Sequence, residues 1–147
     1  MRLPELNDDR FDTEHGLQIA VQAPPEHLQE ILDAVREVDS LQYGDYDAVS
    51  YCTAPGTQHF RSLGSGRNAK TRDTVQVECT VITFFVTGTD THVADILKAI
   101  YWAHPYEEPV IFLTPCIRSL HVRGKDEDNP NRFWNRPTKD WVPEEHR

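Results

Sequence analysis

The sequence predicts an α+β fold in which a four-stranded antiparallel sheet carries two helices on one face. Three observations lead to this prediction. The chain has 147 residues, a size typical of one domain with a single core. Stretches of alternating apolar residues, typical of strands, occur together with two stretches of helical spacing. Their order along the chain is strand, helix, strand, strand, helix, strand, which is the ferredoxin-like order.

The first strand and the first helix are expected over residues 17–22 and 25–39. Leu17, Ile19 and Val21 alternate with polar residues, as in a half-buried strand. Proline is well placed in the first turn of a helix, so Pro25 can begin the helix. Apolar residues then recur at helical spacing, at Leu28, Ile31, Leu32, Val35 and Val38. A turn at 44–47 leads to a second strand over 48–52.

The second half of the chain supplies two more strands and one helix. Residues 75–87 are expected to form a central strand, because they become apolar on both faces toward the end. A helix from about residue 90 follows, with Val93, Ile96, Leu97 and Ile100 on its apolar face. Pro105 offers no N–H and disfavours the helical conformation at His104, so the helix should stop there. Residues 110–119 are the last strand.

The two ends of the chain are expected to differ from this central unit at 17–120. Residues 1–16 are polar and acidic, and we expect a loose arm or one docked on a partner. The tail over 121–147 holds Phe133, Trp134 and Trp141. Tryptophan side chains are costly to leave in water, so the tail aromatics are expected to dock across the sheet or on a neighbouring subunit.

Composition narrows the class of protein. A formal net charge of −9 argues against nucleic-acid binding, which needs a basic face. No apolar run is long enough to span a membrane and no secretory signal is visible, so we expect a cytoplasmic protein without a membrane partner. The three cysteines are widely spaced and lie in expected strands, which favours buried free thiols. Two helices cover only one face of the sheet, so a homo-oligomer, a dimer or a trimer, is expected.

Residues 53–74 are expected to form a long basic loop without secondary structure. They contain four bases and one acid, Asp73, in an otherwise acidic chain. Glycines beside cationic side chains can form a backbone nest for a phosphate or carboxylate. The alternative is a mobile, solvated hairpin loop. The candidate anion-binding residues are Arg61, Gly64, Gly66, Arg67, Lys70 and Arg72.

Residues 104–109 bring together an imidazole, a phenol, two carboxylates and two prolines, Pro105 and Pro109. One interpretation is a site for a divalent metal such as zinc, copper or nickel, or for a small ligand. Its candidate metal ligands are His104, Glu107, Glu108, His59 and Glu78. The favoured interpretation is a structural corner, with His104 at the helix end and with Pro105, Tyr106 and Pro109 directing the last strand and a subunit contact. Glu107 and Glu108 then face either His104 or the basic loop of a neighbouring chain.

Several short motifs, in one order, resemble the insert domain of the Ngg-interacting-factor-like family, whose members are dinuclear-metal hydrolase-like proteins. The motifs are Gly44–Asp47, Gly56–Arg61, Gly64–Gly66, Glu78 and Ala103–Pro109. The last of them also resembles a segment of CutA-like divalent-cation tolerance proteins. Both resemblances imply a ferredoxin-like, PII/CutA-like architecture over residues 17–120. The flanking halves that hold the two metals in the larger relatives are absent here, so their hydrolase activity is not implied.

These observations together favour a non-catalytic, oligomeric PII/CutA-like domain that binds a divalent metal or a small anion, with a regulatory or sensing role implied by the resemblance. No catalytic residue is assigned, because Cys52 lies in an expected strand and neither Ser50 nor Ser62 has a nucleophile-elbow motif. One alternative is a metal-dependent hydrolase acting on a phosphate or nucleotide. Another is a structural interaction module that uses the tryptophan-containing tail.

Overall fold

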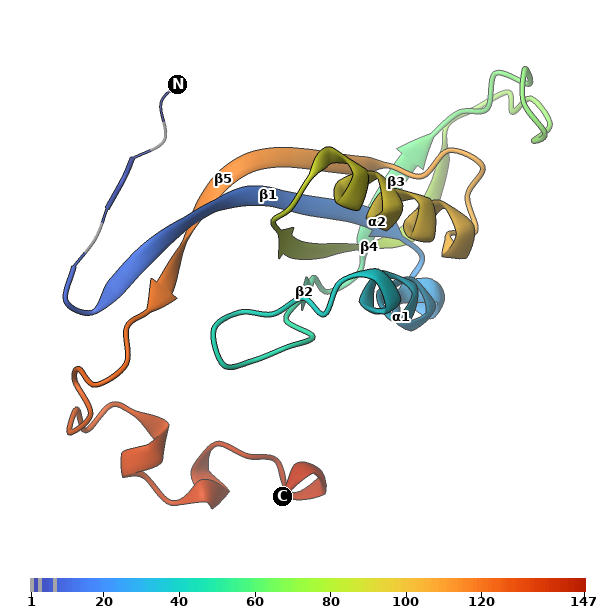
Figure 1. The fold of residues 1–147 in the computed structure, drawn as a ribbon. Helices are drawn as coiled ribbons and strands as arrows, with labels where there is room; N and C mark the ends of the chain where they lie inside the picture. Colours follow the sequence, from blue (N-terminus) through green and yellow to red (C-terminus); the bar gives the residue numbers. More distant parts are fainter. Residues whose placement is uncertain (1, 3, 7) are drawn as a thin grey trace.

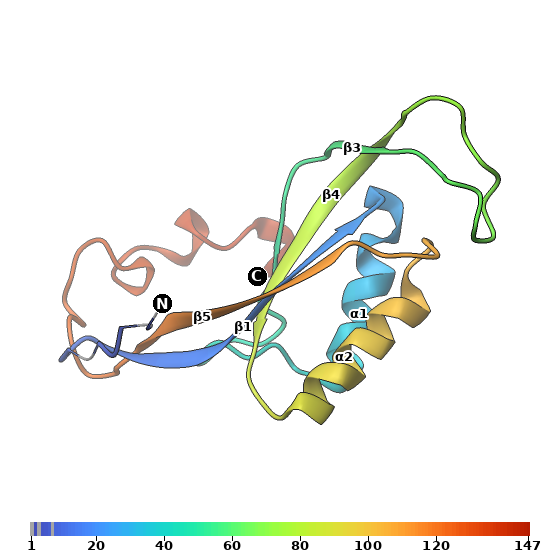
Figure 2. The same ribbon diagram turned by 90° about the horizontal axis from the view of Figure 1, so that it is seen from above.

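The computed structural model describes residues 2, 4–6 and 8–147. Within them, an antiparallel sheet carries two α-helices on one face (Figures 1 and 2). The elements are β1 (Phe11–Ala23), η1 (Pro25–His27), α1 (Leu28–Val38), β2 (Tyr51–Cys52), β3 (Gly56–Phe60), β4 (Val75–Val86), α2 (Asp90–Ala103), β5 (Ile111–His121), η2 (Phe133–Asn135), η3 (Thr138–Asp140) and η4 (Glu144–His146). Every helix in the described part of the chain is too short or too polar to cross a lipid bilayer.

The strand order β2-β4-β1-β5 is that of a ferredoxin-like sheet and confirms the predicted fold class. The sheet has five strands instead of four, because β3 also pairs with β4. Cys52 faces Ile82 and Gly56 faces Cys79, so three residues on one side oppose two on the other. Such an extra residue is a β-bulge, and it separates β2 from β3. The second strand expected over 48–52 is observed only at 51–52. The prediction that residues 53–74 lack secondary structure is therefore wrong for 56–60.

The core lies between the sheet and the two helices, on the face that the alternation of β1 predicts. Ile19 of β1 pairs with Phe84 of β4, and both side chains are buried. The fully buried side chains on this face come from both layers: Ile19, Val21, Ile31, Val35, Ile82, Ile96 and Ile100. Helical and strand periodicity therefore both converge on one core, as expected from the sequence.

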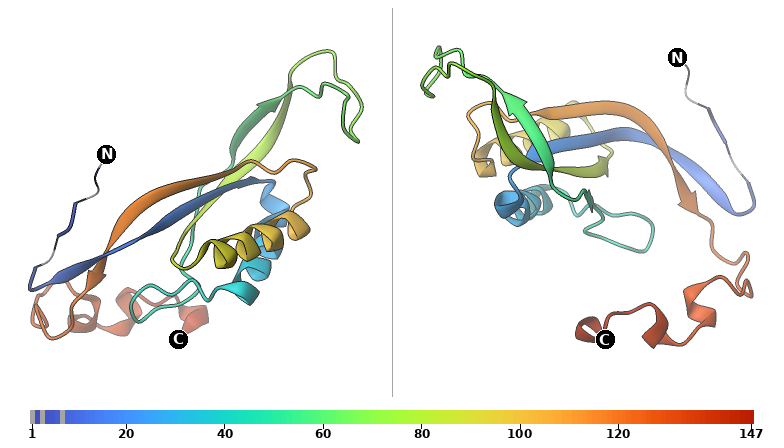
Figure 3. Two further views of the ribbon diagram at one scale, coloured as in Figure 1. Left: turned by 45° about the horizontal axis from the view of Figure 1, so that its top comes forward. Right: turned by 180° about the vertical axis from the view of Figure 1, so that it is seen from behind.

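The N-terminal arm is shorter than predicted, because β1 already begins at Phe11. Residues 11–16 pair with β5 alone, in a register that runs from Phe11 opposite His121 to Gly16 opposite Cys116. This part of β1 and β5 forms a two-stranded ribbon that extends beyond the helices (Figure 3). The expectation of a loose arm fails over 11–16 because β5 supplies backbone hydrogen-bond partners. Positions 1, 3 and 7 of the predicted arm lie outside the described residues.

The C-terminal tail packs mainly on itself and runs apart from the sheet (Figures 1 and 3). Phe133 and Trp141 stack with ring centroids 5.8 Å apart, and the indole N–H of Trp134 donates to the carbonyl of Glu127 at 2.8 Å. All three aromatic side chains remain about half exposed. Docking of the tail on another subunit therefore stays a prediction.

Candidate anion site at the hairpin loop

His104 ends α2 and turns the chain toward β5. Its backbone is extended, with φ −76° and ψ 135°, as expected for a residue that precedes proline. Its N–H still donates to the carbonyl of Ile100 at 2.9 Å, so His104 is the C-cap of the helix. The side chain is 7% exposed and points inward, away from solvent. The predicted helix end at this position is confirmed.

Both ring nitrogens of His104 are bound to main-chain groups. Nε2 lies 2.7 Å from the carbonyl oxygen of Gln22, and Nδ1 lies 3.0 Å from the backbone nitrogen of Tyr106. A carbonyl only accepts and an N–H only donates, so Nε2 carries the proton and Nδ1 accepts. Burial lowers the pKa of His104, the bond to Gln22 partly opposes this, and the charge of His27 lowers it further. His104 is thus a neutral residue that joins the corner to β1.

The structure does not bring the five candidate metal ligands together. His104 has no ring nitrogen left for a metal, and Glu107 turns toward the hairpin loop. His59 and Glu78 lie on the paired strands β3 and β4, two positions out of register, and are exposed. Among the described residues, no three His, Cys, Asp or Glu side chains are grouped so that they could hold a metal ion. In this motif His104 binds the main chain of Gln22 and Tyr106, and Glu107 binds the hairpin loop.

The candidate anion residues lie on one hairpin loop, 61–74, between β3 and β4. The neck of the loop is closed by Ser62 and Thr71, where the N–H of Thr71 donates to the carbonyl of Ser62 at 3.1 Å. The N–H of Ser62 in turn donates to Oγ1 of Thr71 at 3.0 Å. The loop projects beyond the sheet, and its tip returns toward the segment that follows α2 (Figure 2).

The tip of this loop binds the carboxylate of Glu107. The backbone N–H of Arg67 donates to both carboxylate oxygens, with N–O distances of 3.1 Å to Oε1 and 3.0 Å to Oε2. Glu107 therefore faces the basic loop of its own chain, not His104. Two sets of residues that the sequence suggested as separate sites, the basic loop and the corner at 104–109, meet at this contact.

Most of the positive charge on the loop has no acidic partner. The guanidinium of Arg72 binds the carboxylate of Asp73 at 2.9 Å. Among the described residues, the side chains of Arg61, Arg67 and Lys70 form no ion pair, and all three are exposed. Gly64 has φ +81°, a conformation that glycine adopts readily, and the loop folds back over Lys70 there. An anion at the tip would meet one backbone amide and the exposed cations on the same loop.

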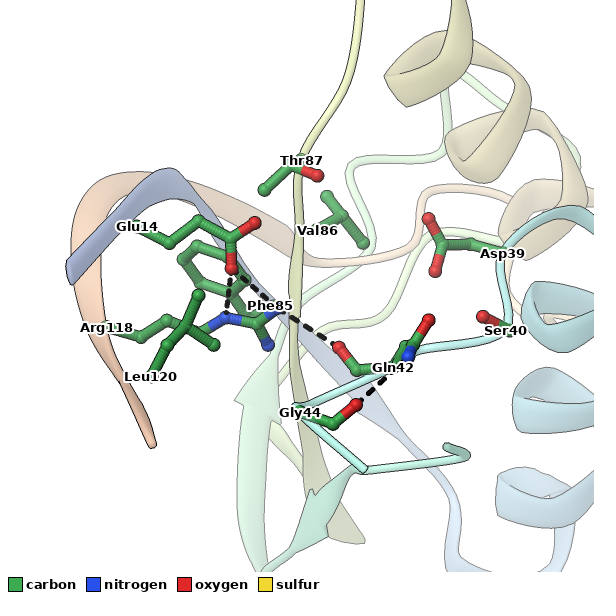
Figure 4. A pocket seen from close by; sticks show the side chains of 10 residues that line it. All are labelled: Glu14, Asp39, Ser40, Gln42, Gly44, Phe85, Val86, Thr87, Arg118 and Leu120. Carbon is green, nitrogen blue, oxygen red and sulfur yellow. Dashed lines mark hydrogen bonds and ion pairs between the residues drawn. The ribbon is translucent and has the colours of Figure 1, made fainter. Parts of the chain in front are cut away.

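A separate cavity of about 390 Å³ lies at the opposite end of β4 (Figure 4). Its most enclosed polar side chain is Arg118, whose guanidinium lies 4.4 Å from the ring centre of Tyr43 and 4.2 Å from that of Phe85. Nε and Nη2 each lie 2.9 Å from the Glu14 carboxylate, and Nη2 also donates to the carbonyl of Gln42 at 3.0 Å. Two aromatic rings contact the guanidinium, and its Nε and Nη2 atoms are bound to Glu14 and Gln42. Arg118 therefore serves mainly to join β1, β5 and the 40–44 loop.

Neither the Arg118 cluster nor the Glu107 contact was found from the sequence. Glu14 and Arg118 are opposite each other only in the observed register of β1 and β5, which no local pattern reveals. Glu14 was assigned to the N-terminal arm and only Arg118 to an expected strand, so no pairing of the two could be inferred from the sequence. Glu107 and Arg67 are 40 positions apart in the sequence. The signal available for their contact was the presence of an acidic motif and of a basic, glycine-containing loop in the same chain.

No family model and no curated protein match the sequence. Among solved structures, a Bacillus cereus protein related to NIF3 superposes with a TM-score of 0.59 at 22% identity, over 74% of this chain and 28% of that protein. The divalent cation tolerance protein CutA1 from Thermus thermophilus superposes with a TM-score of 0.50 at 17% identity, over 69% of this chain and 84% of that one. CutA1 from a psychrotrophic Shewanella bacterium gives 0.50 at 16% identity, over 69% and 80%.

These comparisons confirm, at the level of the fold, the resemblance found in the sequence. The chain shares the ferredoxin-like fold of CutA1 proteins and of one part of the NIF3-related protein. It spans less than a third of the length of the NIF3-related protein. At identities this low the likeness extends to the fold and not to activity or ligand.

Proposed function

We propose that the chain is a non-catalytic, homo-oligomeric PII/CutA-like domain that binds a small anion at the hairpin loop and has a regulatory or sensing role. The observation that carries this proposal is the contact between the Arg67 amide and the Glu107 carboxylate. The loop tip already accepts an oxyanion, supplied by the protein itself. A backbone N–H in a glycine-containing turn is a recurrent way for proteins to bind carboxylates and phosphates.

The charge distribution supports an anion as the ligand. The chain has a net charge of −9, yet Arg61, Arg67 and Lys70 gather on one exposed loop without acidic partners among the described residues. Exposed cations can contact a phosphate by small rotamer changes, and each such contact contributes modestly in water. A metal ion finds no comparable arrangement in the described residues. A two-metal hydrolase would need such an arrangement, so the anion-binding function is favoured over it.

Calorimetric titration of the protein with inorganic pyrophosphate tests this proposal. We expect saturable binding by the wild type. Binding should be roughly fivefold to tenfold weaker in the double variant Arg61→Gln/Lys70→Gln, because two exposed cations are removed. The matched control is Arg36→Gln/Lys98→Gln, which removes equal charge from exposed positions on α1 and α2. Equal weakening in both double variants, or no binding by the wild type, would contradict a site at the loop.

The uncovered face of the sheet supports the homo-oligomer. The alternation of β2 and β5 places Tyr51 and Phe112 on the face opposite the helices, and these side chains are 69% and 58% exposed. Large exposed apolar side chains on one face are typical of protein contacts.

Light scattering measures the mass that this proposal requires. We expect the wild type to have two or three times the chain mass and Tyr51→Ser/Phe112→Ser to shift toward the monomer. Trp102→Ser, on the exposed surface of α2, should leave the mass unchanged. A monomeric wild type would refute the oligomer.

A further inference from the structure

The contact at the loop tip has the geometry of a ligand in a site. The two oxygens of the Glu107 carboxylate are almost equally distant from the Arg67 nitrogen, at 3.1 and 3.0 Å, so they straddle one N–H. The partner is a backbone amide, whose position depends on the conformation of the loop and not on a side-chain rotamer. The loop is thus shaped around an oxyanion that arrives from outside it.

Gly66 makes this approach sterically possible. A Cβ atom at Gly66 would lie 2.8 Å from Oε2 and 3.0 Å from Oε1 of Glu107. Distances this short require one of the two groups to move, so any side chain at position 66 would displace the carboxylate. A glycine that lets an anion reach a neighbouring backbone amide is a feature of phosphate- and carboxylate-binding turns.

Glu107 uses fewer of the polar groups of the loop than an external anion could contact. Its carboxylate is exposed and, within the described part of the chain, forms hydrogen bonds with one main-chain N–H only. Among the described residues, none of the loop cations pairs with Glu107, although Arg61, Arg67 and Lys70 lie on the same loop. A free phosphate or carboxylate has more freedom than a tethered side chain to contact both the amide and these cations.

We propose that Glu107 is an internal ligand of the loop and that an external oxyanion binds by displacing it. This inference rests on the proposed anion-binding function and adds how the site is regulated. Displacement of Glu107 also releases its tether to the corner that begins at His104, so an anion at the loop changes the link between the hairpin and the end of α2. The site is therefore closed by the protein itself until an oxyanion competes for the Arg67 amide.

Two neighbouring glutamates provide a matched pair for the test. Glu107→Gln removes the charge of the internal ligand, and Glu108→Gln removes an equal charge one residue away, from an exposed side chain. In calorimetric titrations with inorganic pyrophosphate, we expect Glu107→Gln to bind about fivefold or more tightly than the wild type, because an interaction with a charged group no longer competes. Glu108→Gln should stay within about twofold of the wild type.

Each other outcome overturns the inference in a recognisable way. An equal gain in both variants would show that only the overall charge matters. Weaker binding by Glu107→Gln would show that Glu107 helps to build the site. If the wild type binds pyrophosphate and Glu107→Gln binds it no more tightly, displacement is refuted while anion binding stands. If neither the wild type nor the variants bind, both proposals are refuted. Hydrogen exchange provides a second readout, because the Arg67 amide should exchange faster in ligand-free Glu107→Gln than in ligand-free wild type.

Discussion

Replacing His104 with leucine should lower the free energy of unfolding by about 2–5 kcal/mol. The substitution keeps an apolar volume similar to that of the ring but leaves the Gln22 carbonyl and the Tyr106 N–H without partners. Each buried main-chain group left unsatisfied costs about 1–3 kcal/mol. Chemical denaturation at neutral pH measures the change. His59→Leu, at an exposed position on β3, is the matched control and should change stability by less than about 0.5 kcal/mol.

The effect of His104 should also depend on pH. The pKa of His104 is lowered in the folded protein, mainly because burial penalises the charged ring. The unfolded chain therefore takes up the proton first, and the stability that neutral His104 contributes is complete above its unfolded pKa of about 6.5 and is lost as the pH falls toward the lower folded value. The difference between wild type and His104→Leu should narrow as the pH falls from 7 toward 5. A difference that widens would contradict a buried, neutral imidazole.

Gly16→Ala should destabilise the protein by about 3 kcal/mol, by overpacking where the β1–β5 ribbon meets the main sheet. An added Cβ would lie 2.5 Å from the carbonyl oxygen of Val86 and 2.4 Å from Cζ of Phe85. The backbone oxygen cannot move without disturbing the pairing of Leu17 with Val86. The ring of Phe85 also supports the guanidinium of Arg118, so its displacement would weaken the Arg118 cluster.

A second glycine in the same sheet provides the comparison. A Cβ at Gly56 would have its nearest neighbour at 3.8 Å, an ordinary van der Waals contact. Gly56→Ala should therefore lie within about 1 kcal/mol of the wild type in thermal or chemical denaturation. Comparable losses in both variants would show that general strand propensity, and not the close approach at Gly16, explains the effect.

The architecture followed from periodicity, because β1 and the two helices each have one apolar face that a short window of sequence reveals, and β4 has the apolar character of a central strand. Ile19 was placed on the apolar face of its strand for this reason, and there it pairs with Phe84. The strand β3 was not foreseen, because the bulge at residues 53–55 that precedes it is defined by the partner strand β4. The strand at 11–16 was missed because its polar sequence is held in place by pairing with β5, not by burial of apolar side chains.

The candidate site was predicted in its components but not in its arrangement. The basic loop and the acidic corner were both recognised, since charge reversal and flanking prolines are local signals. Their contact through Arg67 and Glu107 joins segments 40 residues apart, which local signals do not report. The candidate metal ligands do not meet in the described part of the chain, where His104 uses both ring nitrogens for main-chain groups. A histidine that follows a helix and precedes a proline can serve the backbone as readily as a metal.

The most direct test of an anion site at the hairpin is a titration of isotopically labelled protein with inorganic pyrophosphate, followed through the backbone amide resonances. The central prediction is that the Gly66 and Arg67 amides shift saturably with a single dissociation constant, while amides of the 40–44 loop beside Arg118 do not follow them. If the Arg67 resonance stays unchanged at saturating pyrophosphate, the loop is not the anion site and the account of Glu107 as its internal ligand is wrong.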